Sequence, residues 1–199
     1  MAVIGQVELE DVTGLSEEDL RVLLFDPTDV YKKIYSDTRS NKEIFSHYKR
    51  RNQINMSVIF PDNADKTCAC GCGRKLTGRR RRWFSDECSR FAFTVHQIIS
   101  GDVNTIRHTL IRILGEESCN ACGVKDSDIP RRMFRPEDET DLSKRLKLWN
   151  KEIKEMANKI HVEHIIPVHK GGGGCWLSNY QFLCEDCHKE KTKRDKKTF

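Results

Sequence analysis

The cysteines constrain the fold of this chain more than any other feature of its sequence. Nine cysteines occur in 199 residues, and eight of them fall into two sets with short internal spacings. The C-terminal cluster consists of two C-x-x-C pairs, Cys119 with Cys122 and Cys184 with Cys187. The central cluster is looser and consists of Cys68, Cys70, Cys72 and Cys88. The C-x-x-C spacing is typical of zinc sites, whereas C-x-C-x-C is less usual, and we expect metal ions to hold distant segments together.

Composition and the first residues favour metal over disulfide bonds. The first six residues lack the basic-then-apolar order of a signal peptide, and no apolar stretch is long enough to cross a bilayer. We therefore expect an intracellular protein, in the cytoplasm or, in a eukaryote, the nucleus, where thiols stay reduced. Only 37% of the residues are apolar and 33% are charged, which leaves a thin core that zinc would reinforce.

The charge is distributed unevenly along the chain. Residues 1–30 contain eight acidic side chains and one basic one, whereas residues 74–82 contain six basic side chains and no acidic one. Residues 188–199 add six basic and two acidic side chains. Two basic concentrations in a chain of net charge +5 make a polyanion a plausible partner, although a solvated surface gives the same pattern.

The hydrophobic spacing predicts an α+β chain that is mainly helical. Helices are expected over residues 16–25, 28–35, 40–48, 85–99, 106–114, 141–158 and 185–193. A short extended piece is expected over residues 58–63, and longer strands over residues 160–167 and 179–183. We predict three domains: a helical region at 1–62, a zinc-knuckle and helical region with DNA contacts at 63–115, and a C-terminal domain with a basic tail at 116–199.

The C-terminal motif resembles the HNH endonuclease family. Its parts are Glu163-His164-Ile165-x-Pro167, then Gly172-Gly173, then Asn179-x-Gln181-x-Leu183-Cys184-x-x-Cys187-His188-x-x-Lys191-Thr192. The variant with Cys175 after the glycines is similar to HNH domains of bacterial nucleases and of some eukaryotic fork-remodelling helicases. The resemblance covers about residues 117–195 and implies a ββα-metal fold that hydrolyses DNA.

The resemblance also implies roles for individual residues. His164 would be the general base that deprotonates water, and Glu163 and His188 would bind a catalytic Mg²⁺ or Mn²⁺ ion. Asn179 would hold the hairpin so that His164 stays aimed. Many family members have Asp where Glu163 stands, and the extra methylene moves the carboxylate by ~1.5 Å.

The two cysteine clusters are predicted to be structural zinc sites, distinct from the catalytic ion. The C-terminal cluster has the composition of a closed tetrahedral site. In the central cluster, His96 is an alternative to one cysteine. Phosphate contacts are expected from the two basic stretches, in particular from Arg79, Arg80, Arg81, Arg82, Lys189 and Lys191.

The sequence thus predicts a metal-dependent HNH endonuclease that acts on DNA, of restriction type or otherwise sequence-reading. A homodimer would cut both strands. Two alternatives stay open: a structure-specific or nicking nuclease of repair or phage packaging, and a zinc-dependent DNA-binding module that does not cut.

Overall fold

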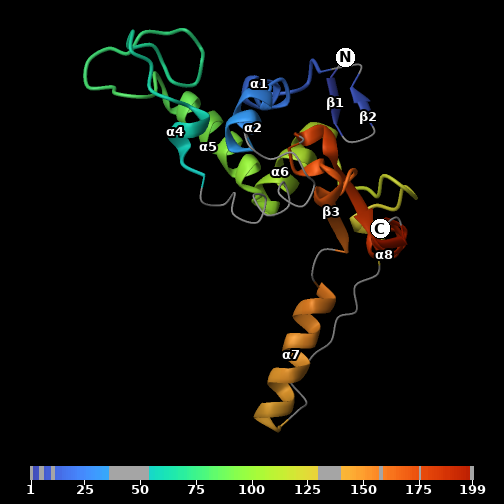
Figure 1. Cartoon of the computed structure of the whole chain (residues 1–199). Helices are drawn as coiled ribbons and strands as arrows, with labels where there is room; N and C mark the ends of the chain where they lie inside the picture. Colours follow the sequence, from blue (N-terminus) through green and yellow to red (C-terminus); the bar gives the residue numbers. More distant parts are fainter. Residues whose placement is uncertain are drawn as a thin grey trace. The chain divides into compact units, whose positions relative to one another are not determined.

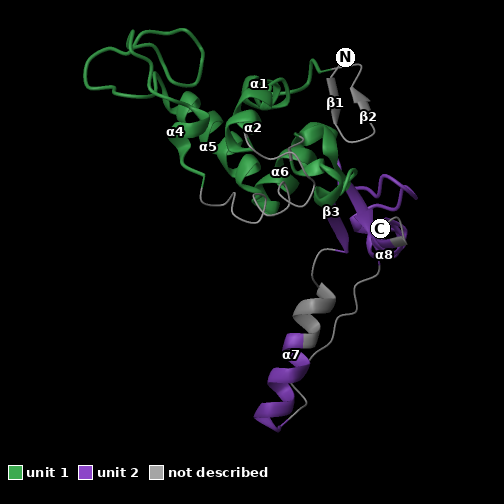
Figure 2. Cartoon of the chain, in the orientation of Figure 1, with its two compact units in different colours: residues 1–115, 164–181 green, residues 116–163, 182–199 purple. Residues whose placement is uncertain are grey.

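The computed structural model describes residues 2–4, 7–9, 12–35, 54–129, 140–156, 159–174 and 176–197. These residues form an α+β chain of helices and two small two-stranded sheets (Figure 1). The chain divides into two compact units (Figure 2): unit 1 contains residues 1–115 and 164–181, and unit 2 contains residues 116–163 and 182–199. The three-domain division from the sequence remains a prediction. In the described part, each helix is too short or too polar to cross a membrane.

Unit 1 begins with a hairpin that the sequence did not predict. Strand β1 (Ala2–Ile4) pairs antiparallel with β2 (Val7–Leu9), so that Ala2 lies opposite Leu9. The helical N-terminal region predicted from the sequence thus begins with a short hairpin that the prediction did not include. Strands of three residues are too short to show the alternation by which a strand is found in a sequence.

Five described helices follow in unit 1, before the chain enters unit 2. They are α1 (Glu17–Leu23), α2 (Thr28–Ile34), α4 (Met56–Ile59), α5 (Asp86–Ser100) and α6 (Val103–Leu114). Side chains of Ser16, Ser85 and Asp102 accept hydrogen bonds from the first turns of α1, α5 and α6, as expected of N-caps. The helices predicted at these places are confirmed. The helix predicted over residues 40–48 lies outside the described residues.

Helix α4 corrects the extended piece predicted over residues 58–63. Val58 and Ile59 are helical, because the Asn55 side chain accepts a hydrogen bond from Ser57 N–H and the Phe60 N–H closes the turn on Met56. An Asn cap in front of a single turn leaves no periodic apolar pattern to detect.

The core of unit 1 lies where α1 packs against α5 and α6. Val22, Val95, Ile99 and Leu110 are fully buried there. Asp19 of α1 accepts from Arg112 of α6 at 2.7 Å, and this carboxylate is only slightly exposed. The ion pair therefore adds a partly buried link between helices that apolar contact already holds.

The connection between β3 (Ile160–His164) and β4 (Tyr180–Cys184) packs into the same core. The Trp176 ring lies 5.5 Å from the Phe25 ring, and its indole N–H donates to the Val22 carbonyl at 3.3 Å. Phe25 also contacts Phe60 and Phe91. The N-terminal helices thus pack against a loop that lies more than a hundred residues later in the sequence.

Unit 2 contains α7 (Leu142–Met156), most of β3 and β4, and α8 (Glu185–Lys197). The strands form a two-stranded sheet, and α8 follows β4 directly. The predicted strand-loop-strand-helix order is confirmed, with β3 ending at His164 rather than at Pro167. It ends early because the Asn179 side chain binds both the N–H and the carbonyl of Ile166 and removes them from the ladder.

Candidate functional site

The C-terminal cluster lies within unit 2, and its four sulfur atoms lie within 4.8 Å of one another. Cys119 and Cys122 lie in one tight turn. Gly123, at φ 77°, closes this turn by donating its N–H to the Cys119 carbonyl. Cys184 ends β4 and Cys187 lies in the first turn of α8. Four thiols at this separation fit the tetrahedral shell of zinc.

Backbone donors favour the thiolate of Cys119 in the C-terminal cluster, whereas a hydrogen bond with Cys184 and burial raise the pKa of Cys187. Burial raises the pKa of Cys119, but N–H groups of Cys184, Cys122 and Ala121 outweigh it and lower this pKa to about 7. A thiol that ionises near neutral pH binds metal with little cost for losing its proton. Asn120, between the two cysteines, exchanges two hydrogen bonds of 2.8 Å with the backbone of Phe182 and so fastens the turn to β4.

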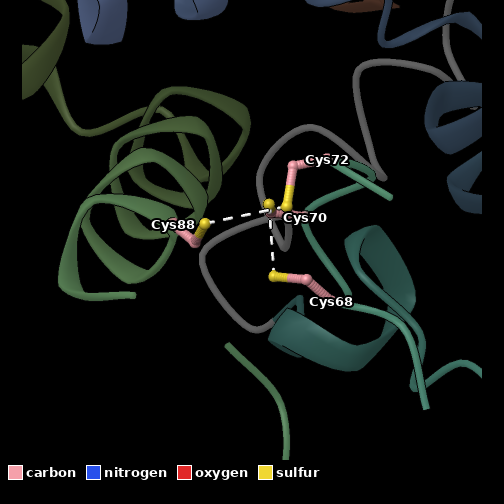
Figure 3. Close-up of side chains that lie close together, drawn as sticks. All are labelled: Cys68, Cys70, Cys72 and Cys88. Carbon is pink, nitrogen blue, oxygen red and sulfur yellow. Dashed lines mark hydrogen bonds between the residues drawn. The ribbon is translucent and has the colours of Figure 1, made fainter. Parts of the chain in front are cut away.

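The central cluster lies in unit 1, where Cys68, Cys70 and Cys72 meet Cys88 from the first turn of α5 (Figure 3). All four side chains point toward one another, again with sulfur atoms within 4.8 Å. The alternative ligand His96 is not part of this group, because its Nε2 lies 2.8 Å from the Ile54 carbonyl oxygen. Both cysteine clusters can therefore hold zinc.

Hydrogen bonds favour the thiolate of Cys88 in the central cluster and oppose that of Cys70. Burial raises the pKa of Cys88, whereas the Ser85 hydroxyl and the neighbouring thiols lower it, to about 6 overall. Burial and a hydrogen bond with Cys68 raise the pKa of Cys70 to about 12. Guanidinium groups add donors: Arg21 of α1 donates to Cys70, and Arg74 donates to Cys72 and Cys88, each at 3.3 Å. These cations would offset the negative charge of a zinc ion bound by four thiolates.

Glu163 and His188 face each other in unit 2. Oε2 of Glu163 lies 3.3 Å from Nε2 of His188, and both side chains are partly exposed. The ring of His161 stacks on His188 with 4.8 Å between centroids and fixes the plane of the imidazole. A carboxylate oxygen and an imidazole nitrogen that meet at an open surface are suitable ligands for a divalent cation.

Lys191 lies beside this pair, and only 6% of its side chain is exposed. Its ammonium group donates to Asp195 at 2.5 Å and lies 3.6 Å from Oε1 of Glu163. The phosphate contact predicted for Lys191 stays a prediction, and the ammonium group faces two carboxylates of its own unit. Sequence reasoning missed this role, since a Lys and an Asp at i,i+4 on a charged helix read as a solvated pair.

Replacing Lys191 with methionine should destabilise unit 2. The change leaves Glu163 and Asp195 without their cation, and a cost of about 2 kcal/mol is expected because both carboxylates keep some contact with water. Thermal unfolding followed by circular dichroism measures this effect. Lys189→Met is the matched control, because the exposed Lys189 pairs with Glu185 in solvent. Equal melting temperatures for the two variants, with weaker DNA binding by Lys191→Met, would instead favour the predicted phosphate contact.

His164 and Asn179 lie in unit 1. The imidazole of His164 packs on the Tyr180 ring with 4.6 Å between centroids. The buried Asn179 amide makes three hydrogen bonds of 2.8–3.1 Å, two to the backbone of Ile166 and one to the Gly172 carbonyl. A Cβ at Gly172 would lie 1.8 Å from the Ile166 carbonyl oxygen, so this clamp requires glycine. Asn179 thereby fixes the backbone that directly follows His164.

The predicted basic contacts occupy different environments. Arg79, Arg80 and Arg81 are exposed, whereas Arg82 is half-buried, donates to the Phe60 carbonyl at 2.6 Å and pairs with Asp62. Lys189 is exposed and paired with Glu185. Cys175, the remaining cysteine, lies outside the described residues.

Comparison with known proteins places the C-terminal residues in a family. Residues 149–194 match the model of the HNH endonuclease family. A stretch of 36 residues is 58% identical to the human DNA annealing helicase and endonuclease ZRANB3 (Homo sapiens), and 56% identical to its mouse counterpart (Mus musculus). Each match covers 18% of this chain and 3% of the relative. No solved structure matches. The C-terminal segment of this chain, residues 149–194, is thus similar to HNH endonuclease domains.

Proposed function

We propose that this chain is a metal-dependent endonuclease that hydrolyses phosphodiester bonds in DNA. The observation that carries the proposal is the Glu163 carboxylate facing the His188 imidazole at 3.3 Å, inside the segment that matches the HNH endonuclease family. These are two ligands for a divalent cation, Mg²⁺ or Mn²⁺, on the strand and helix of the matched domain. DNA, the substrate in the relatives' printed name, is also consistent with the basic stretches.

The residues would divide the work of hydrolysis among them. His164 would take the proton from the attacking water, since a neutral imidazole is a common general base in enzymes. Tyr180 limits the tilt of this ring, and Asn179 keeps the following backbone in place. Glu163 and His188 would hold the divalent cation, with Lys191 steadying the second oxygen of Glu163. The bound cation would stabilise charge on the phosphoryl oxygens and the leaving oxygen.

We further propose that the N-terminal residues help to select the DNA, as in a restriction-type or other sequence-reading nuclease. Support comes from the packing of Trp176 against Phe25 and Val22 within unit 1, since the loop between the two strands of the HNH hairpin shares its core with the N-terminal helices. The zinc-knuckle residues belong to the same unit.

Cleavage of supercoiled plasmid and of mixed genomic DNA tests the proposed activity. Purified zinc-loaded protein should cut or nick plasmid with Mg²⁺ or Mn²⁺, and should leave it intact with EDTA. Discrete fragments would indicate a sequence-reading nuclease, whereas nicks or smears would indicate a structure-specific or nicking enzyme. Intact plasmid and genomic DNA with either ion, from folded protein, would favour the DNA-binding module that does not cut.

A further inference from the structure

A polar cavity lies beside the central cysteine cluster in unit 1. Its volume is about 480 Å³, within the range of about 300–1,000 Å³ that small-molecule sites occupy. Two loop segments form its walls, residues 62–69 and residues 76–82. The lining side chains that matter here are Asp62, Asn63, Lys66, Arg80, Arg81 and Arg82.

The lining carries a clear excess of positive charge. Four cations face one carboxylate, and that carboxylate, Asp62, is already paired with Arg82 at 3.4 Å. Across the described ranges, no carboxylate lies within ion-pair distance of Lys66, Arg80 or Arg81. Cations that gather around a concave surface without a protein anion are suited to bind an external one, and arginine favours phosphate.

The cavity walls are fixed to the central cluster at several points. Ala69 N–H donates to the Arg82 carbonyl at 3.0 Å, and Phe84 N–H donates to the sulfur of Cys68 at 3.2 Å. The Arg80 guanidinium lies over the Phe84 ring, with 5.6 Å to the centroid. Lys66 has a left-handed backbone at φ 60°, which is unusual for a residue with a side chain. A flexible basic tail would show none of these attachments.

The cavity also contains neutral polar groups, which a site for phosphate alone does not require. Asn63 donates its amide hydrogens to Thr67 Oγ1 and to the Cys68 carbonyl, so its own amide oxygen is held in one orientation. Amide and hydroxyl groups of this kind bind the edges of bases and the sugar. The volume also exceeds what a phosphate group alone would fill. Together these features indicate a ligand that joins an anion to a larger polar body.

We propose that this cavity binds one nucleotide of the DNA substrate, with its phosphate on Arg80, Arg81 and Lys66 and its nucleoside against Asn63. The inference rests on the proposed function for the identity of the substrate. A general basic surface would use Arg79 and Arg81 alike. The proposed site uses Arg81, which lines the cavity, and not Arg79, which belongs to the same basic run but lies outside the lining. The nucleotide belongs either to a strand end or to a strand interior from which it is extruded.

Binding of fluorescent DNA by the His164→Ala variant of the 199-residue chain tests the cavity without cleavage. Arg81→Ala should weaken binding by ~10-fold, the loss of one charge-assisted hydrogen bond, and lower the salt slope by about one. Arg79→Ala should weaken it by less than ~3-fold. Deoxyadenosine monophosphate should compete for DNA more strongly than inorganic phosphate, and Arg81→Ala should remove this difference. Linear DNA and closed circles distinguish a strand end from an extruded nucleotide.

Two results would overturn the inference. One is an equal loss of DNA affinity in Arg79→Ala and Arg81→Ala, which a solvated basic surface would give. The other is competition by deoxyadenosine monophosphate no stronger than that by inorganic phosphate. Zinc content, measured for each variant, shows that the central cluster is intact. Because these assays measure binding, nucleotide binding without cleavage would contradict only the proposed nuclease activity, and cleavage without nucleotide binding would contradict only the cavity.

Discussion

His164→Ala should lower the rate of DNA cleavage by ~10²–10⁴-fold, the usual contribution of a positioned general base. In the proposed mechanism His164 accepts the proton of the attacking water. In the alanine variant only solvent can accept this proton. Plasmid cleavage under single-turnover conditions with Mg²⁺ measures the effect. Circular dichroism and zinc content should stay unchanged, because His164 belongs to neither cysteine cluster.

The matched control is His108→Ala, on an exposed position of α6 far along the chain from the HNH segment. It should cut at the rate of the unmodified protein. A His164→Ala protein that is folded, holds its zinc and cleaves within ~3-fold of the control would exclude His164 as the base. Glu163 and His188 would then be the next candidates to accept the proton of the attacking water.

Cys187→Ser should remove one zinc ion and unfold unit 2. Structural zinc contributes ~10–16 kcal/mol in small zinc domains, which is as large as the ~5–15 kcal/mol that stabilises a typical protein. In this chain the expected loss is large because the C-terminal cluster joins the turn at Cys119, the end of β4 and the start of α8. Elemental analysis for zinc, limited proteolysis and plasmid cleavage together measure the effect.

Cys175→Ser is the control for the cluster variant, because its spacing assigns Cys175 to neither cluster. It should keep the zinc content and the protease resistance of the unmodified protein. Unchanged zinc content and unchanged protease resistance in Cys187→Ser would show that the cluster does not hold metal. Loss of zinc with cleavage intact would show that the metal is not needed to shape the nuclease hairpin.

Much of the site was predictable because its chemistry is local in the sequence. The C-x-x-C spacing identified four sulfurs that the fold brings within 4.8 Å, although Cys122 and Cys184 are separated by more than sixty residues. The helix starts at Ser16 and Ser85 were found because a capping side chain acts within its own turn, whereas the start capped by Asp102 lies three residues before the predicted one. The motif around Glu163 and His164 predicted the family that the comparison then matched.

Other features were decided only by tertiary structure. The sequence presents Lys191 as one lysine in a basic helix, yet its ammonium group is buried between Asp195 and Glu163, a residue of another element. In the sequence the N-terminal helices lie far from the HNH motif, yet in the structure Trp176 packs into one core with them. The arginine run gives no sign in the sequence that Arg81 lines a cavity and Arg79 does not. Caps, turns and metal spacings act between near neighbours and can be read along the chain, whereas burial and charge pairing depend on which distant segments meet when the core closes.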